Sequence, residues 1–350
     1  MRGQADRRSS GARRRWAAGA AALLALVLAA AAPASADPAA DPGGPATRCQ
    51  VTDPRLSELS GLVEVGNRVF AVDDGGDRVD VYVLDAGCQV VAVRSAPVDP
   101  YDPEDLALGA DGTLWLADTG DNQGTRETVA LIALRPDGGT SVCRLAYPDG
   151  ARDVEALLLA PDGTPYLVSK EVLGASAVYR PDSALVDGGT VGLTEVAEVD
   201  LTLTGTPGGP VGRAGQLMVT GGAVSPDGRL LALRTYTDAY VWPLSGSDVV
   251  GALAGEPVRV ALPAAPQGEA VGFTGDGGAL LVASEGLPSD VTVVPLPTAA
   301  GPVATVEPSD GSRPEPLPTA AGPSRVPAAL VAAALAAVLV WVAGRLRRRT

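Results

Sequence analysis

Short apolar runs bounded by Asp-Gly and similar turns fill the chain between residues 48 and 296. At five places, a polar residue before an apolar strand lies seven positions ahead of the following turn residue. The five pairs are Ser60 and Asn67, Glu104 and Asp111, Glu155 and Asp162, Thr220 and Asp227, and Glu269 and Asp276. Short strands with recurring turn chemistry at a constant offset indicate a repeated β unit.

Each turn is followed by further apolar runs that complete such a unit. Second strands are predicted at 69–72, 114–117, 165–168, 230–233 and 280–283. Third strands are predicted at 79–84, 128–134, 175–180, 239–244 and 291–295, and fourth strands at 89–95, 140–147, 196–204 and 257–262. No amphipathic helix of ordinary length is visible, so the pattern predicts an all-β fold.

Five units of about four strands predict a five-bladed β-propeller over residues 48–296. The fifth unit lacks a fourth strand, which residues 49–51 can supply by pairing with the last blade and closing the ring. Six blades are the alternative, because the interval from Glu155 to Thr220 could hold an extra hairpin. A β-sandwich would not explain the constant offset.

The two ends of the chain have the composition of targeting segments. Residues 1–36 predict a signal peptide, with Arg13–Arg15, an apolar run and Ala-Ser-Ala, and residues 37–47 a disordered lead-in. Residues 297–325 predict a Pro/Ala-rich stalk and 326–344 a transmembrane helix. The Arg-rich residues 345–350 then predict a cytoplasmic tail, so we expect a single-pass protein of the cell membrane with its propeller outside.

Composition narrows the possible chemistry. The chain of 350 residues contains no histidine, which excludes Ser-His-Asp triads and imidazole-bound metals, and its one lysine is Lys170. Between the two basic ends, residues 37–326 carry 17 basic and 40 acidic side chains, a net charge of −23. Such a surface repels nucleic acid and anionic lipid and favours divalent cations or basic partners.

The repeat places two sets of polar residues at one end of the propeller axis, which we call the mouth. The predicted inner ring is Ser60, Glu104, Glu155, Thr220 and Glu269. The predicted second ring is Asp73, Asp118, Ser169, Arg234 and Ser284, with Asp74, Lys170 and Glu285 beside it. Several carboxylates around one channel need a compensating cation, and calcium is the expected ion because it takes oxygen ligands without imidazole.

The mouth supports two functional hypotheses. As a binding or scaffold module, it would capture a small molecule, a sugar or a basic peptide. As a hydrolase of small esters, lactones or phosphoesters, it would use Glu155 or Glu269 to activate water while calcium or Arg234 polarises the carbonyl. Glu104, Asp153, Lys170 and Glu285 are the predicted ligand-binding residues, and Asp73, Asp77, Asp118, Asp121 and Asn122 are the predicted metal ligands. Alternatively, the glutamates accept backbone amides at blade junctions and the Asp-Gly runs are ordinary turns.

Several motifs between residues 59 and 295 carry a resemblance to a known family. They are Ser60-Gly61-Leu62, Asp73-Asp74-Gly75-Gly76-Asp77, Glu104-Asp105-Leu106, Asp118-Thr119-Gly120-Asp121-Asn122, Asp153-Val154-Glu155-Ala156, Gln267-Gly268-Glu269-Ala270 and Ser284-Glu285-Gly286. Together they resemble the secreted actinobacterial β-propellers grouped under the esterase-like activity of phytase, and more distantly lactonase-type and WD40-like propellers. The resemblance implies calcium-assisted ester or phosphoester hydrolysis.

Three cysteines follow the predicted signal peptide, at Cys49, Cys88 and Cys143. An exported protein can form disulfides, and at most one internal pair is available here. A Cys49–Cys88 bond would staple the closing strand to the first blade, but the sequence leaves the pairing open.

Overall fold

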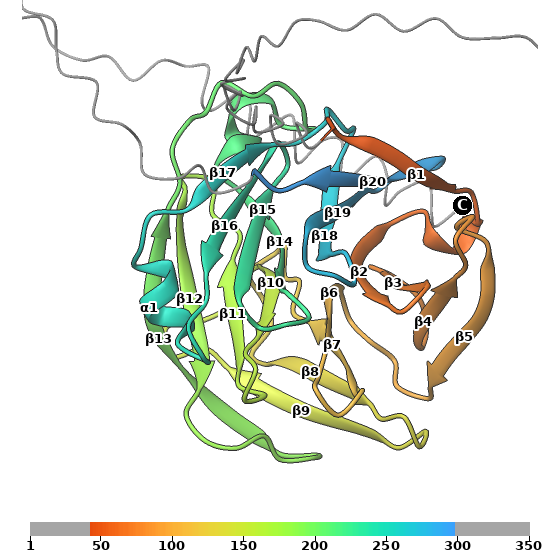
Figure 1. Cartoon of the computed structure of the whole chain (residues 1–350). Coiled ribbons are helices and arrows are strands. Elements are labelled where there is room, and N and C mark those ends of the chain that lie inside the picture. The colour runs from red at the N-terminus through yellow and green to blue at the C-terminus, as the bar shows by residue number, and fades with distance from the viewer. Residues whose placement is uncertain (1–42, 298–350) are drawn as a thin grey trace, which may run out of the picture. The chain divides into compact units, whose positions relative to one another are not determined.

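The computed structural model describes residues 43–297, and its strands form five antiparallel sets of four that we call blades 1 to 5 (Figure 1). Blade 1 contains β2 (Leu59–Val65), β3 (Arg68–Asp73), β4 (Val79–Leu84) and β5 (Val90–Ala96), and blade 2 contains β6 (Pro103–Leu108), β7 (Leu114–Asp118), β8 (Val129–Leu134) and β9 (Thr140–Ala146). Blade 3 contains β10 (Val154–Leu159), β11 (Pro165–Ser169), β12 (Ala175–Pro181) and β13 (Thr190–Asp200), and blade 4 contains β14 (Val219–Val224), β15 (Leu230–Thr235), β16 (Asp238–Pro243) and β17 (Val258–Ala261). Blade 5 contains β18 (Gly268–Phe273), β19 (Ala279–Ser284), β20 (Ser289–Pro295) and the N-terminal β1 (Ala46–Val51).

The five sets confirm the expected all-β, propeller-like fold, with one difference in sheet pairing. Residues 190–192 of β13 pair in parallel with residues 144–146 of β9, so blades 2 and 3 share one eight-stranded sheet. The long interval from Glu155 to Thr220 contains no extra hairpin. It is filled by the eleven-residue strand β13 and a loop with the short helix η2 (Gly212–Gln216).

The ring closes through its innermost and outermost strands. The first strands of the blades contact one another in chain order, and β18 of blade 5 contacts β2 of blade 1. On the outside β1 pairs antiparallel with β20, as predicted from residues 49–51, although it begins slightly earlier, at Ala46. A disulfide joins Cys49 of β1 to Cys88 in the turn between β4 and β5, which confirms the stapling arrangement, while Cys143 is free and buried.

Apolar side chains fill the spaces between neighbouring blades. Leu158, Val168, Leu231 and Trp242, for example, belong to one buried cluster shared by blades 3 and 4. Close to the axis the backbones themselves approach closely. A Cβ atom at Gly61 would lie 2.6 Å from the Leu106 amide nitrogen, so this crossing requires glycine.

The segments predicted at the two ends of the chain stay predictions. The signal peptide at 1–36, the stalk from 298 onward, the transmembrane helix at 326–344 and the tail at 345–350 lie outside the described residues. Within residues 43–297, no helix has the length and apolar character needed to span a bilayer. The only α-helix in that range, α1 (Val249–Leu253), has five residues.

Candidate functional site

A register shift occurs at the same point in the first strand of every blade. In β2, for example, Leu59 pairs with Asp73 and Gly61 pairs with Val72, so that Ser60 is the additional residue. The corresponding shifts span Glu104 in β6, Glu155 in β10, Thr220 in β14 and, together with Ala270, Glu269 in β18. These are the residues of the predicted inner ring. A β-bulge re-aims a side chain out of the regular alternation, which accounts for the separate ring at the mouth.

The three glutamates of the inner ring are almost completely buried. Glu104, Glu155 and Glu269 are 7%, 2% and 3% exposed. One carboxylate oxygen from each of Glu104, Asp153 and Glu155 lies within 4.8 Å of the other two. Three acidic oxygens at this separation form a potential cation site, which we call the glutamate group.

Neighbouring elements hold the glutamate group in place. The Asp121 amide donates to Oδ1 of Asp153 at 2.8 Å, which joins the loop after β7 to the start of blade 3. Gly120 leaves room for the carboxylates, because a Cβ atom at this position would lie 2.0 Å from Oε1 of Glu104. The loop of residues 118–122 therefore packs against the glutamate group and holds Asp153 in place.

Lys170 supplies the positive charge closest to these carboxylates. Its Nζ atom donates to Oε1 of Glu155 at 2.6 Å and lies 5.4 Å from the centre of the Tyr236 ring. Burial opposes the charged form of Lys170, but Glu155, Tyr236 and Glu269 outweigh it and raise the lysine pKa well above its ordinary value. Lys170 therefore stays protonated and neutralises part of the acidic charge.

Several other carboxyl groups of the mouth lie close to one another, and their pKa values are raised. Burial, followed by the field of Glu155, raises the pKa of Glu104 well above its ordinary value. Burial also raises the pKa of Glu285 to about 8, with Glu269 adding to the shift, and that of Asp74 to about 9. Strong shifts caused by both burial and like charges are typical of functional sites.

Glu269 has a carboxylate oxygen, Oε2, that is fully buried and lacks a hydrogen-bond donor. Burial raises the pKa of Glu269, although Lys170 and Arg234 oppose the shift. A buried carboxylate oxygen without a donor is costly unless a ligand, an ion or a proton satisfies it.

Arg234 does not occupy the second ring as predicted. Val219 pairs with Thr235 and Gly221 pairs with Arg234, so Thr235 is the blade 4 counterpart of Asp73, Asp118, Ser169 and Ser284. A shift of one residue turns a strand side chain to the opposite face. Arg234 accordingly lies in the interior, where its Nη1 atom donates to the carbonyls of Ala270 and Ala283 at 2.6 and 2.8 Å and joins blades 4 and 5.

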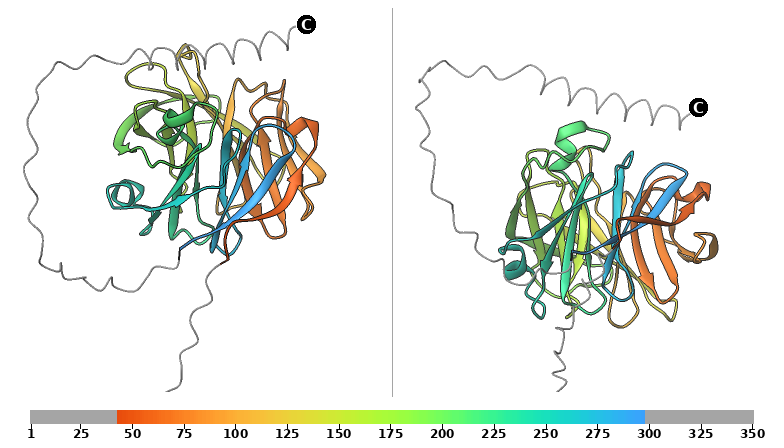
Figure 2. Two further views of the ribbon diagram at one scale, coloured as in Figure 1. Left: turned by 90° about the horizontal axis from the view of Figure 1, so that it is seen from above. Right: turned by 45° about the horizontal axis from the view of Figure 1, so that its top comes forward.

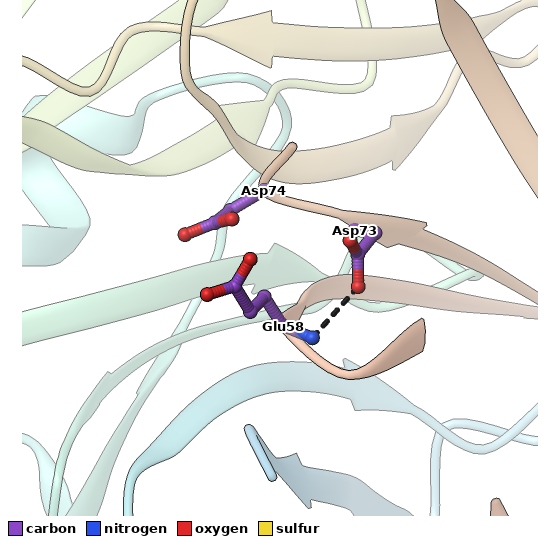
Figure 3. Close-up of side chains that lie close together, drawn as sticks. All are labelled: Glu58, Asp73 and Asp74. Atoms are coloured by element: carbon purple, nitrogen blue, oxygen red, sulfur yellow. Dashed lines mark hydrogen bonds between the residues drawn. The ribbon is translucent and has the colours of Figure 1, made fainter. Parts of the chain in front are cut away.

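A second acidic group lies at the mouth end of blade 1. Figure 3 shows Glu58, Asp73 and Asp74 with their carboxylates close together, and the Glu58 amide donates to Oδ1 of Asp73 at 2.7 Å. Burial raises the pKa of Asp73 to about 7. Of the five predicted metal ligands, only Asp73 belongs to either acidic group found among the described residues.

The other predicted metal ligands lie outside both acidic groups, and two of them, Asp118 and Asp121, accept backbone amides of loops. Asp118 accepts the Tyr101 and Asp102 amides and pairs with Arg126 at 3.1 Å. Asp121 accepts the Thr125 and Arg126 amides. Asp77 lines a cavity of about 250 Å³ between blades 1 and 2, and Asn122 is exposed.

Two residues of the mouth escaped the sequence analysis, and both have a signal in the repeat. Glu58 lies two positions before Ser60, as Asp102 and Asp153 lie two positions before Glu104 and Glu155. Tyr236 follows Thr235, so the corrected alignment makes it the counterpart of Lys170. The turn-based alignment already contains the signal for Glu58, whereas Tyr236 is found only with the corrected register of blade 4.

The chain matches no protein family and no characterised protein in sequence. Among solved structures, it is similar to a gluconolactonase from Xanthomonas campestris (20% identity, 68% of this chain and 72% of the other, TM-score 0.40). It is also similar to a soluble aldose sugar dehydrogenase from Escherichia coli (12%, 71% and 98%, 0.41) and to a chain of a nidogen–laminin complex (15%, 65% and 72%, 0.38). These neighbours include enzymes and a binding complex, and similarities of this size assign no activity to the chain.

Proposed function

We propose that the mouth is the active site of a calcium-dependent hydrolase of small esters or lactones. The supporting observation is the placement of Glu104, Asp153 and Glu155 as one oxygen cluster in a mouth where Glu269 keeps a buried, unpartnered oxygen. The glutamate group suits a cation, and the Glu269 oxygen suits a proton acceptor. A binding function alone requires the glutamate group but not the Glu269 oxygen.

The residues present fit a hard divalent cation. Every donor in the glutamate group is a carboxylate oxygen, and the chain has no histidine that would favour zinc. Such a cation would be held by Glu104, Asp153 and Glu155, and it would polarise the carbonyl of a bound ester. Lys170 keeps Glu155 in position and offsets one of the negative charges.

The chain itself provides the proton transfers. Glu269 in its ionised form takes a proton from a water molecule as the water oxygen attacks the ester carbonyl carbon. The bond from that carbon to the leaving oxygen then breaks, and Glu269 returns the proton to the leaving oxygen. An ester gives an acid and an alcohol, and a lactone gives an open hydroxy acid. Burial raises the pKa of Glu269, which makes its carboxylate a stronger proton acceptor than an exposed glutamate.

A second candidate is a calcium-dependent binding module for a sugar or a basic peptide. It is favoured because two of the predicted catalytic residues already have partners within the protein. Glu155 pairs with Lys170, and Arg234 donates to backbone carbonyls. For either function we propose an extracellular location, with residues 326–344 as the anchor. This location rests on the sequence of the two ends alone.

Hydrolysis assays with matched variants separate the two candidates. The protein is incubated with a panel of five- and six-membered lactones and p-nitrophenyl acetate, with calcium or with a chelator. We expect calcium-dependent hydrolysis, and Glu269→Gln should lower kcat at least about 100-fold, as expected for loss of a general base, without weakening calcium binding. Asp162→Asn, in the turn at the opposite end of blade 3, is the control. Calcium binding without hydrolysis of any substrate would favour the binding module, and full activity in Glu269→Gln would refute the assigned base.

A further inference from the structure

The opposite end of the propeller axis holds a second cavity. Its volume is about 400 Å³, and all five blades contribute to its lining through the ends of their first strands and the following turns. The lining is mainly aliphatic, and Leu108 within it is 37% exposed. Its principal apolar members are Leu62, Leu106, Leu108, Leu159, Val224 and Phe273. We call this cavity the rear pocket.

Asp105 separates the rear pocket from the mouth. This fully buried carboxylate lies in β6 between Glu104 of the mouth and Leu106 of the rear pocket. Its oxygens accept the amides of Leu106 and Leu157 at 2.8 Å and of Gly222 at 3.1 Å, which ties blades 2, 3 and 4 together at the axis. The rear pocket is therefore separate from the mouth.

The acidic side chains at the rim of the rear pocket already have partners. Glu64 accepts from Arg48 at 2.7 Å and from the Gly275 amide at 3.0 Å. Asp227 accepts from Ser225 at 2.7 Å and from Arg229 at 2.6 Å. No acidic side chain in the lining is left to attract a cation, so the pocket suits an uncharged, apolar occupant.

The chain leaves the last blade beside this pocket. Pro295, at the end of β20, pairs with Ala279, and the Leu296 amide donates to the Gly278 carbonyl at 3.4 Å. These contacts lie at the turn that follows Phe273, a residue of the pocket lining. Figure 2 shows the end of β20 and the beginning of β1 at the same end of the blades. The C-terminal segment thus starts at the rim.

That segment contains a suitable occupant. The uncharged sequence Pro-Leu-Pro-Thr-Ala-Ala-Gly-Pro occupies residues 295–302 and occurs again at 316–323. The first copy begins within β20, so its start is held in the sheet. The second copy is separated from residue 297 by a stretch with charged residues at Glu307, Asp310, Arg313 and Glu315. Proline limits the conformational entropy that the second copy would lose on binding.

We propose that residues 316–323 bind in the rear pocket of their own chain. A flexible tether of roughly 20 residues has a root-mean-square length of about 25 Å, enough to bring the second copy back to the rim. Such a tether gives a local concentration on the order of millimolar, so weak apolar contacts suffice. The bound segment would hold the rear of the propeller against the C-terminal part of the chain and leave the acidic mouth open.

Cross-linking in the full chain tests this proposal. Ala110, an exposed residue of the pocket lining, is changed to cysteine and paired with either Thr319→Cys in the second copy or Ser312→Cys in the charged stretch. A short bismaleimide is added, and the linked peptides are quantified by mass spectrometry. Residue 312 is closer in sequence to the rim, so a freely moving tether links it at least as fast as residue 319. Binding in the pocket predicts that residue 319 links about tenfold faster.

Two controls make the result specific. Leu173→Cys places a thiol in the loop after β11, at the mouth end, and should link poorly to Thr319→Cys. An excess of a synthetic peptide of residues 316–323 should slow the link between positions 110 and 319. Equal rates for positions 312 and 319, equal linking to position 173, or no effect of the peptide would each overturn the proposal. Unchanged melting curves confirm that each variant is folded.

Discussion

Asp105 provides a direct test of how the centre of the propeller is held together. The residue is completely buried, and three backbone amides from three different blades donate to its two oxygens. Burial raises its pKa well above the ordinary value, and the three amides oppose that shift. Replacing Asp105 by Ala removes the acceptor of all three buried amides.

The cost follows from the number of amides left without a partner. A buried donor that loses its acceptor costs about 1–3 kcal/mol, so three of them cost about 3–9 kcal/mol in the free energy of unfolding. This is comparable with the whole stability of a typical domain, about 5–15 kcal/mol. Asp105→Asn keeps one oxygen and should cost only about a third as much.

Equilibrium urea unfolding of the wild type and both variants measures these differences. Asp111→Ala serves as the control, because Asp111 accepts two bonds from Thr113 but lies in an exposed turn of the same blade. That control should cost less than about 1 kcal/mol. If Asp105→Ala unfolds within 1 kcal/mol of the wild type, the carboxylate does not hold the blades together and the reasoning is wrong.

Two further predictions concern closure and charge. Cys88→Ser should lower the free energy of unfolding by about 2–4 kcal/mol, because the disulfide to Cys49 closes a loop with a sequence separation of 39 residues; an unchanged urea midpoint would contradict this. The pKa values of Asp73, Asp74 and Glu285 are raised to about 7, 9 and 8, above those of the same groups in the unfolded chain. These carboxyls therefore stabilise the calcium-free protein at low pH, and that contribution is lost as pH rises. Calcium-free stability should therefore fall between about pH 5 and pH 9, by at most about 1.4 kcal/mol per pH unit for each carboxyl, and a stability that rises over this range would show that they are ionised in the folded protein.

Much of the fold could be predicted from the sequence because each blade repeats the same local physics. Turn residues at a constant offset located the first two strands of every blade, and the missing fourth strand of blade 5 identified β1 as the closing strand. The parallel pairing of β13 with β9 had no such signal. It depends on how two neighbouring blades lie against each other at their outer edges.

The candidate site was less predictable because it depends on register. The alignment on turns assigned Arg234 to the position that Thr235 occupies. The buried guanidinium that joins blades 4 and 5 was therefore predicted to lie at the mouth, and Tyr236 was not predicted there. The role of Asp105 could not be predicted, since two of its amide partners, Leu157 and Gly222, are far away in sequence. The residues at the equivalent position in the other four blades are all small, so Asp105 is the exception. They are Gly61, Ala156, Gly221 and Ala270.

Calcium titration followed by thermal unfolding tests the central proposal most directly. Calcium at one hundred times its dissociation constant should stabilise the wild type by about 2.7 kcal/mol. Glu104→Gln and Glu155→Gln keep the side-chain size and remove a ligand charge, so both should lose most of this response, whereas Asp162→Asn at the opposite end should keep it. A wild type that does not respond to millimolar calcium, or a response that Asp162→Asn abolishes as fully as Glu155→Gln, would contradict a cation site at the mouth.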